Sequence, residues 1–482
     1  MKPEDIKIEE IVKKIEQNKE TLSRRDALKF MALSPLAATM LASSAASSKA
    51  EAAASEATGK IVIVGGGAGA LMMLAKLRKA LKNPNIVIIA PNDKHIYQPG
   101  QVFVAAGEYK PSDIIFDNSG YIGSDVTWVK DEVATFDPDN NKVTTRNGSV
   151  VDYDYLIVAA GISYQYDQIE GLDGSMIGKH NISSVYYNDL EHGTAEGGEI
   201  TFEWFKAVAE AAKTSKPRVI CTQPSTPIKC GGAPQKILYL VDDYLRQRKL
   251  TADFTFATAG GKLFGLPEIS DSLEKTQQMY GNITNKFSHD LIRIDAEKKV
   301  ATFLHKYQVQ GEWDEEYEEY DMIDKEDEVD IEYDFIHIVP PMSGSNAVAA
   351  SLLAWQRGNA AGWLEVDKES LQHRRYSNVF GIGDVCGIPL GKTGGSARHH
   401  APIVTANLIS VMEGKEPTQK FDGYTVCPLK TSYGEIIMAE FNYDGLAPSF
   451  PLDPAKPRWI WWAFDLYMLK PMYKHLMLNG LM

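Results

Sequence analysis

The sequence predicts an α/β fold built from two Rossmann-like dinucleotide-binding domains, followed by short amphipathic helices at the C-terminal end. Three observations carry this prediction. A buried strand runs directly into a glycine-rich turn and a helix near residue 65. A second strand of this kind follows near residue 217, and a late apolar strand ends in Gly383-Asp384. Strands and helices that alternate at such spacings are typical of doubly wound parallel sheets.

Length and charge set the outer limits of the interpretation. At 482 residues the chain is long enough for two or three domains. Its formal charge of −14 is concentrated in residues 312–334, where fourteen acidic residues stand against one lysine. This run predicts a solvated hairpin or flap, with a docking patch for a basic partner as the alternative. The sequence has no basic patch and no metal-ligand spacing, so neither nucleic acid nor a metal ion is expected.

The N-terminal segment has the pattern of an export signal. Ser23-Arg24-Arg25-Asp26 is a twin-arginine pattern, an apolar run follows over residues 30–42, and Ala50-Glu51-Ala52 is a candidate cleavage site. The apolar run is too short to span a bilayer comfortably, and an uncleaved amphipathic anchor is the alternative interpretation. Twin-arginine export would place the protein in the periplasm, an oxidising compartment for its four cysteines.

The first glycine turn has the features of a dinucleotide site. It joins the strand 60–64 to the helix-forming run 71–81. Glycines permit the tight turn and the close approach of a pyrophosphate, and helix amides then face the phosphates. No carboxylate ends the second strand, where Ala90 stands, so Asn92 or Asp93 is the expected ribose contact. The residues of this turn expected to contact the cofactor are Gly65, Gly66, Gly67, Ala68, Gly69 and Ala70.

Two later segments favour a flavin over a nicotinamide nucleotide. The strand 155–158 ends in Ala159-Ala160-Gly161, and the strand 376–382 ends in Gly383-Asp384. A carboxylate at that place can accept hydrogen bonds from the ribityl chain of FAD. Both segments are similar to those of glutathione-reductase-like flavoproteins, in which the FAD domain is interrupted and resumes late in the chain.

The second domain departs from a nucleotide site. After the strand 217–222 the chain reads Gln223-Pro224-Ser225-Thr226-Pro227, with no GxGxxG and with two prolines that remove amide donors. Electrons are therefore not expected to arrive from a nicotinamide. Cys230 stands where the glycine loop would be, which points to sulfur chemistry. From the residues alone, the four cysteines allow three complete pairings, and nothing local decides among them.

Five segments give the chain a resemblance to the sulfide:quinone oxidoreductases, most of all to the branch that includes the mitochondrial enzymes. The segments are 97–100, 226–236, 339–342, 371–376 and 423–429. The most specific are Cys230-Gly231-Gly232-Ala233-Pro234-Gln235-Lys236 and Gly381-Ile382-Gly383-Asp384. The family implies FAD, two redox cysteines on one face of the flavin and a quinone on the other. Carried over to this chain, the cysteines are Cys230 and Cys386, and the further cofactor contacts are Gln98, Val133, Ala160, Gly161, Gly383, Asp384, Lys392 and Thr393.

The resemblance also implies a reaction. Hydrosulfide attacks a disulfide between Cys230 and Cys386 and leaves one persulfide and one thiolate. Lys392 and Thr393 open the next helix, where an ammonium group and amides can stabilise negative charge; the alternative is a surface lysine at a helix start. Of the remaining cysteines, Cys221 is expected to be a buried apolar thiol, and Cys427 to be structural.

The chain changes character from Arg458 onward. The segment is rich in Trp, Tyr and Met, lysines punctuate it, and Pro471 is expected to break it into two short helices. Neither half could span a bilayer, so both are predicted to lie in the headgroup region as membrane anchors. A dimer interface or a tail that covers the core is the alternative. Aromatic residues of this segment, or Tyr433 and Phe441, are expected along the path of the quinone.

Together these observations predict an FAD-dependent sulfide:quinone oxidoreductase. It would oxidise hydrogen sulfide to sulfane sulfur or polysulfide, reduce a membrane quinone, and attach peripherally to the periplasmic face of the inner membrane. The alternatives are the flavoprotein subunit of flavocytochrome c sulfide dehydrogenase, which passes electrons to a cytochrome c, and a non-catalytic flavin-bound redox sensor. A homo-oligomer is left open. The expected parts are 1–57 (signal and linker), 58–165 and 345–425 (FAD domain), 166–344 (second Rossmann-like domain) and 426–482 (quinone and membrane region).

Overall fold

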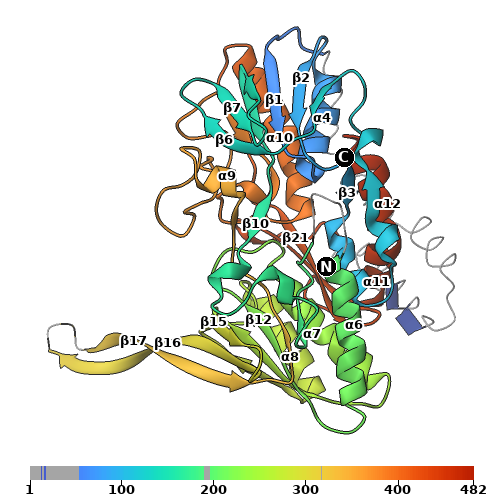
Figure 1. The fold of residues 1–482 in the computed structure, drawn as a ribbon, viewed down its shortest axis with the longest axis vertical. Helices are drawn as coiled ribbons and strands as arrows, with labels where there is room; N and C mark the ends of the chain where they lie inside the picture. Colours follow the sequence, from blue (N-terminus) through green and yellow to red (C-terminus); the bar gives the residue numbers. More distant parts are fainter. Residues whose placement is uncertain (1–11, 14–15, 18–53, 189–195, 316, 318) are drawn as a thin grey trace.

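The computed structural model describes residues 12–13, 16–17, 54–188, 196–315, 317 and 319–482. The twin-arginine pattern, the apolar run and the candidate cleavage site lie outside these residues. The described chain forms two lobes, each built around a parallel sheet, and a long hairpin projects from the second lobe (Figure 1). Two Rossmann-like sheets are what the sequence predicts.

The first parallel sheet has five strands in the order β20-β9-β1-β2-β5. Its central strand β1 (Lys60–Val64) pairs with β2 (Asn85–Ile89) on one side and with β9 (Tyr155–Val158) on the other. β5 (Thr127–Val129) forms one edge, and β20 (Val379–Gly381) forms the other. A strand from late in the chain therefore completes the sheet, as the Gly383-Asp384 segment predicts.

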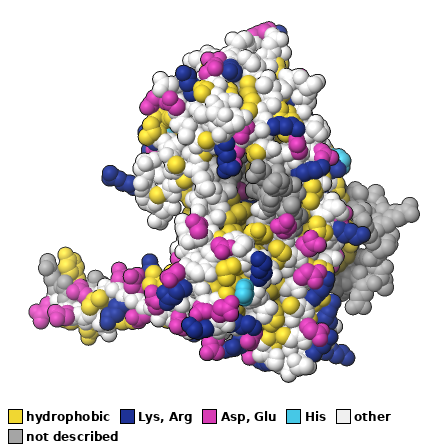
Figure 2. All heavy atoms as spheres, viewed as in Figure 1, with side chains coloured by type: hydrophobic (Ala, Val, Ile, Leu, Met, Phe, Trp, Pro, Cys, Tyr) yellow, Lys and Arg dark blue, Asp and Glu magenta, His cyan; other side chains and the backbone are white. Residues whose placement is uncertain are grey.

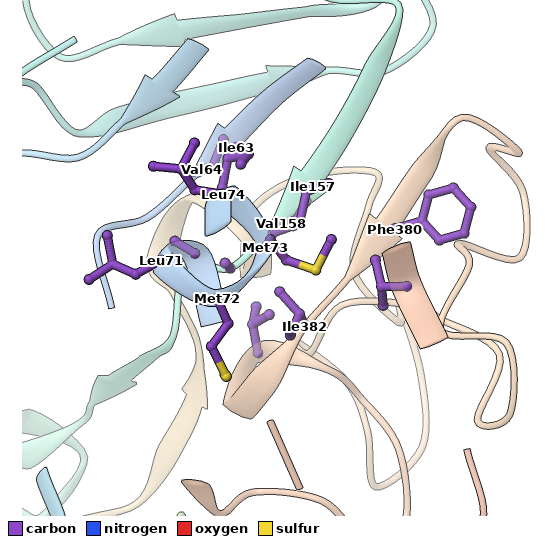
Figure 3. Close-up of a cluster of buried hydrophobic side chains, with 14 of the residues drawn as sticks. Ile63, Val64, Leu71, Met72, Met73, Leu74, Ile157, Val158, Phe380 and Ile382 are labelled. Atoms are coloured by element: carbon purple, nitrogen blue, oxygen red, sulfur yellow. The ribbon is translucent and has the colours of Figure 1, made fainter. Parts of the chain in front are cut away.

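Helix α4 (Ala68–Ala80) leaves β1 directly and buries its apolar side chains against this sheet (Figure 3). The strands are rich in Ile and Val, which suit a pleated surface that is buried on both faces. Helix α10 (Gly394–Met412) packs beside α4. Each of the buried Leu and Met side chains contributes about 1.5–3 kcal/mol, which fixes the strand ends around the glycine turn. The labelled side chains of this cluster are Ile63, Val64, Leu71, Met72, Met73, Leu74, Ile157, Val158, Phe380 and Ile382.

The second parallel sheet also has five strands, in the order β11-β18-β12-β13-β14. Three helices accompany it, and α7 starts just after the loop that carries Cys230. The chain reaches this sheet through β10 (Ile162–Tyr164) and leaves it through β19 (Met342–Gly344), which pair antiparallel. The strands and helices of this lobe are β11 (Ile182–Ser183), β12 (Arg218–Gln223), β13 (Asp253–Thr258), β14 (Ile283–Lys286), β18 (Phe335–His337), α6 (Glu196–Ala211), α7 (Ala233–Arg246) and α8 (Pro267–Tyr280).

The acidic run forms the end of the first strand and the whole second strand of a long hairpin. β16 (Val300–Asp314) and β17 (Glu319–Glu332) pair antiparallel, and β15 (His289–Asp295) pairs with the base of β16. Acidic side chains lie along this arm, which stands away from the body of the molecule (Figure 2). The predicted solvated hairpin is confirmed.

The chain ends with a small antiparallel sheet and a helical segment. The sheet contains β21 (Thr425–Ser432), β22 (Glu435–Asn442) and β23 (Gly445–Leu446). The remaining elements are β3 (Lys94–Ile96), α5 (Gln101–Ala105), β4 (Ile115–Asp117), β6 (Val133–Asp137), β7 (Lys142–Thr145), β8 (Val150–Asp152), α9 (Asn346–Ala349), α11 (Trp459–Phe464) and α12 (Lys470–Met472).

The C-terminal helix is a single run of helical residues rather than two helices. Wide π-helical turns, Asp465–Leu469 and Tyr473–Met477, flank α12. The prediction that Pro471 breaks the helix is wrong, because a wider turn accommodates it. Proline has no amide hydrogen, and the Leu466 carbonyl five residues earlier accepts a hydrogen bond from the Tyr109 hydroxyl.

Most aromatic side chains of this helix cover the core. Trp461, Trp462 and Phe464 are buried, and they belong to the same apolar cluster as α7. The outward-facing apolar side chains are fewer, with Leu476 37 % exposed and Leu481 59 % exposed. Among the described residues, no helix combines the length and the apolar character needed to cross a bilayer. The aromatic residues therefore hold the helix onto the body, which is the alternative that the sequence leaves open.

Candidate active site

A cavity of about 600 Å³ lies at the carboxyl ends of the strands of the first sheet. Its walls include residues that follow β1, β2, β9 and β20. This edge of a doubly wound sheet is where ligands bind in such folds. The predicted cofactor residues that line it are Gly65, Gly66, Gly67, Ala68, Gly69, Gln98, Val133, Ala160, Gly161, Gly383, Asp384, Lys392 and Thr393.

The glycine turn is shaped by close backbone packing. Gly65 has a φ of +119°, and a Cβ atom there would lie 2.3 Å from the carbonyl oxygen of Ala159. Gly67 is the N-cap of α4, and a Cβ atom there would meet nothing within 4 Å. The first strand is thus held against β9, while the helix N-terminus stays open toward the cavity. Such an arrangement suits a pyrophosphate.

One expected contact differs from the sequence prediction, and the structure favours one of the two alternatives for the ribose contact. Ala70 does not line the cavity, because its side chain is buried in the core between α4 and the sheet. Of the two candidate ribose contacts, Asn92 lines the cavity, whereas Asp93 is not among the lining residues. The Asp93 carboxylate instead accepts a hydrogen bond of 2.5 Å from Lys130.

The cysteine pair is the main correction to the sequence prediction. The Sγ atom of Cys230 lies 3.5 Å from the Sγ atom of Cys427, not beside Cys386. Cys230 precedes α7 and Cys427 lies on β21, and these two elements pack against each other. Cys427, expected to be structural, is therefore the partner of Cys230.

Cys386 has a different environment. It follows the turn Gly383–Val385, and its backbone forms a bridge with Leu364 that turns the side chain into the core. The thiol is fully buried and does not line the cavity. Burial raises the pKa of the Cys386 thiol to about 12, although the charge of Lys392 acts in the opposite direction. The predicted pair of Cys230 and Cys386 is wrong because the turn points this thiol away from the cavity. Cys221 is a buried thiol on β12, as predicted.

Cys230 has a strained backbone and a charged neighbour. Its φ of +53° lies in the left-handed region, which a residue other than glycine rarely adopts. Its amide donates a hydrogen bond of 2.9 Å to the carbonyl oxygen of Lys392. The ammonium group of Lys236, in the first turn of α7, lies 2.9 Å from the Cys230 sulfur. The loop therefore aims the thiol at both Lys236 and the cavity.

These contacts separate the two thiols in acidity. The hydrogen bond from Cys427 is the largest influence that lowers the pKa of Cys230; Lys236 and Lys430 lower it further, while burial opposes them. The pKa of Cys427 is raised well above its ordinary value by the same hydrogen bond and by burial. The directions of these shifts make Cys230 the more acidic thiol of the pair.

Two more lysines lie on the cavity wall. Lys392 donates to the carbonyl oxygens of Asp384 (2.9 Å) and Cys386 (2.7 Å), and the following residue, Thr393, is the N-cap of α10, as predicted. Lys229 donates to Gln98 (2.9 Å) and to the Tyr164 hydroxyl. Burial lowers the pKa of each lysine to about 8. Lys229 was not singled out from the sequence, although it lies in one of the five segments of resemblance.

The C-terminal helix supplies an apolar part of the wall. Tyr433 and Phe441, which were expected along this path, are not among the lining residues. The helix residues that line the cavity are Phe464, Asp465, Leu469, Met472, Tyr473 and Met477.

Comparisons with known proteins agree with this geometry. Residues 59–194 match the family described as pyridine nucleotide-disulphide oxidoreductase. The chain is 37 % identical to a mitochondrial sulfide:quinone oxidoreductase of Dictyostelium discoideum, over 87 % of this chain and 86 % of that protein. It is 33 % identical to the mitochondrial sulfide:quinone oxidoreductase of Mus musculus, with the same coverage. The solved sulfide:quinone oxidoreductase of Aquifex aeolicus has the same fold, with a TM-score of 0.66 at 20 % identity over 88 % of this chain and 92 % of that one.

Proposed function

Because the chain belongs to the sulfide:quinone oxidoreductase family, we propose that it oxidises hydrogen sulfide at Cys230 and Cys427 and passes the electrons through FAD to a quinone. The observation that carries this proposal is the distance of 3.5 Å between the sulfur atoms of Cys230 and Cys427. Cys230 lines the same cavity as the glycine turn. In thiol–disulfide exchange the thiol of lower pKa leaves faster, so the difference in acidity between Cys230 and Cys427 favours attack by hydrosulfide.

The residues of the cavity fit an FAD. The open N-terminus of α4, with no side-chain cap at Gly67, offers amides to the pyrophosphate. The Asp384 carboxylate lines the same wall, and within the described part of the chain it accepts no protein hydrogen bond, so it is free to accept from the ribityl hydroxyls. The positive charges of Lys229 and Lys392 interact electrostatically with that carboxylate. When bound, FAD supplies the two-electron chemistry that joins the thiols to the quinone.

The thiol acidities assign the sulfur steps. In the oxidised enzyme Cys230 and Cys427 share a disulfide. Hydrosulfide forms a bond to the Sγ atom of Cys427, the disulfide bond breaks, and Cys230 leaves as a thiolate next to Lys236. The thiol of lower pKa is the better leaving group, so the persulfide is on Cys427. A second hydrosulfide takes the outer sulfur of the persulfide and leaves as a disulfide anion, the shortest polysulfide, while Cys427 becomes a thiol. Reoxidation of the two thiols to the disulfide then releases the two electrons that sulfide lost.

The apolar wall from the C-terminal helix suits the quinone. Phe464, Leu469 and Met472 offer an apolar surface that adapts to a ring and its hydrocarbon tail. Since this helix exposes Leu476 and the segment that follows it exposes Leu481, we place the membrane surface on this side. Vesicle co-sedimentation tests this placement: the substitutions L476E and L481E together should release the protein from the membrane and leave sulfide-driven reduction of the flavin intact. Unchanged sedimentation would contradict it.

Export to the periplasmic face rests on the twin-arginine pattern. Expression in bacterial strains with and without the twin-arginine translocon tests it. The proposal requires that the protein reach the periplasm only when the translocon is present, and that Arg24→Lys with Arg25→Lys block export.

Anaerobic mixing with sulfide tests the function itself. Sulfide should bleach the flavin absorbance of the purified protein, and a quinone analogue should restore it. NADH should leave the flavin oxidised, because the loop that follows β12 lacks a GxGxxG motif. Restoration by cytochrome c but not by quinone would favour the flavocytochrome c alternative, and a flavin that sulfide does not bleach would favour the redox sensor.

A further inference from the structure

Lys430, which acts on Cys230, belongs to a buried ion pair whose acidic member, Asp465, has no role in the sulfur steps. The Nζ atom of Lys430 lies 2.7 Å from Oδ2 of Asp465, and each side chain is only 3 % exposed. Lys430 follows Cys427 by three residues on β21, and Asp465 opens the first π-helical turn of the C-terminal helix. Both residues line the cavity. The pair thus joins the strand that carries one redox cysteine to the tail.

Stability does not explain this pair. Removing two charges from water costs several kcal/mol each, and apolar replacements of a buried ion pair are often neutral or stabilising. The surroundings are already apolar, with the Lys430 ammonium 4.3 Å from the ring centroid of Phe103 and Trp462 packed on the same ring. A well-packed apolar pair at Lys430 and Asp465 would hold the tail as well. The charges of Lys430 and Asp465 are therefore expected to serve a purpose other than stability.

Asp465 provides a negative charge that acts on both lysines nearest to the cysteine pair on α7 and β21. Lys236 faces the Cys230 sulfur from α7, and Lys430 acts on it from β21. Asp465 acts on Lys236 and pairs with Lys430. Two lysines thus stand against one thiolate and one carboxylate. The other ionisable groups that act on Cys230 are Cys427 on β21, Lys229 in the same loop, Asp384 after β20, and Tyr186.

We propose that Asp465 is a positioning residue for the cysteine pair: by holding Lys430 in a buried ion pair, the docked C-terminal helix sets how strongly the thiolate form of Cys230 is stabilised. The proposal rests on the proposed function, since it concerns the same thiolate. It makes the tail part of the sulfide site as well as of the quinone wall.

The sign of each substitution follows from the charges. Lys430→Gln removes a cation and leaves Asp465 unbalanced, so the Cys230 thiolate is destabilised. Asp465→Asn removes an anion and leaves Lys430 unbalanced, so the thiolate is stabilised. A merely structural role predicts a different result, because loosening the tail would expose the site and move the acidity of Cys230 back toward that of an ordinary thiol in both variants.

Site-resolved alkylation of the reduced, FAD-loaded protein measures how easily Cys230 forms a thiolate in each variant. The rate of iodoacetamide modification of the Cys230 peptide is followed by mass spectrometry across pH, without sulfide. The midpoint should rise by about one pH unit in K430Q, fall in D465N, and return close to that of the unsubstituted protein in the double variant K430Q/D465N. K430R, which keeps the charge, should leave the midpoint in place.

Three outcomes would overturn the proposal: an unchanged midpoint in K430Q, a midpoint in D465N that does not fall, or a shift in K430R as large as in K430Q. If K430Q does not retain FAD, the double variant K430Q/D465N is compared with D465N instead. These two proteins also differ by the positive charge of Lys430, so the alkylation midpoint must be higher in the double variant. Because no sulfide is added, failure here is distinguishable from failure of the sulfide reaction.

Discussion

The ammonium group of Lys236 lies 2.9 Å from the sulfur of Cys230, which is six residues earlier in the chain. Lys236 is buried and Cys230 is half-buried, so solvent screens this pair less than a surface pair. The helix α7 begins between the two residues, and its N-terminus adds to the positive potential at the thiolate. The local structure thus makes Cys230 the group that leaves when hydrosulfide attacks.

Replacing Lys236 tests this assignment. In Lys236→Gln the pKa of Cys230 should rise by about one to three pH units, because an opposite charge within hydrogen-bond distance is lost. The ultraviolet absorbance of the thiolate, followed through a pH titration of the reduced protein, measures the change. Lys213→Gln is the matched control, since Lys213 lies in the turn after α6, is exposed, and forms a surface ion pair with Glu210 at the end of that helix. Equal titrations of the two variants would contradict the assignment.

The identity of the second cysteine is tested by three serine substitutions. Cys427→Ser should abolish bleaching of the flavin by sulfide while the protein still folds and binds FAD. Cys386→Ser and Cys221→Ser should keep the reaction and lose about 1–3 kcal/mol of stability, because each places a hydroxyl in an apolar core. Stopped-flow absorbance and thermal unfolding measure the two effects. Bleaching that survives in C427S but not in C386S would restore the pairing that the sequence predicts.

The local parts of the fold could be read from the sequence. Glycine and threonine residues indicate local turns and helix caps, because these features depend on short-range backbone geometry. Examples are the glycine turn at Gly65, the Gly383-Asp384 turn and the N-cap at Thr393. The acidic hairpin follows from charge that cannot be buried. These features place FAD without knowledge of the rest of the molecule.

The cysteine pair could not be read in the same way. Cys230 and Cys427 are 197 residues apart and meet only because β21 packs on α7. Cys386 stands nearer in sequence to a recognised turn, but its bridge to Leu364 rotates the thiol inward, which no local pattern shows. The usable signal was the segment 423–429, which contains Cys427 and belongs to the resemblance. The course of the helix past Pro471 depends likewise on a distant hydroxyl, that of Tyr109.

Two glycines of the first turn should respond differently to substitution by alanine. Gly65→Ala should destabilise the whole protein, because its Cβ would meet the Ala159 carbonyl at 2.3 Å and its φ is +119°. Gly67→Ala should fold, since its Cβ would meet no atom of another part of the described chain within 4 Å, yet bind FAD less tightly because the methyl group enters the cavity. Unfolding midpoints of the apoprotein and FAD titrations separate the two effects. Tight FAD binding in G67A would show that the pyrophosphate lies elsewhere.

The pH dependence of the reaction should reveal which cavity lysine supports it. Burial lowers the pKa of Lys392 and of Lys229 to about 8, so each loses its positive charge as the pH rises through 8. A positive charge on the wall beside Asp384 stabilises negative charge that develops there during electron transfer. The rate of flavin bleaching by sulfide should therefore decline above pH 8. We expect Lys392→Gln to be slow and to lack this decline, and Lys229→Gln to keep it.

Loss of folded protein does not explain such a decline. The pKa of both lysines is lowered on folding, so the unfolded chain binds more protons than the native one between pH 8 and the ordinary value of 10.5. Their contribution to stability consequently rises with pH across that window. Circular dichroism at each pH is the control. If K392Q keeps the alkaline decline while K229Q loses it, Lys229 is the supporting charge; if both variants keep it, neither lysine sets the rate.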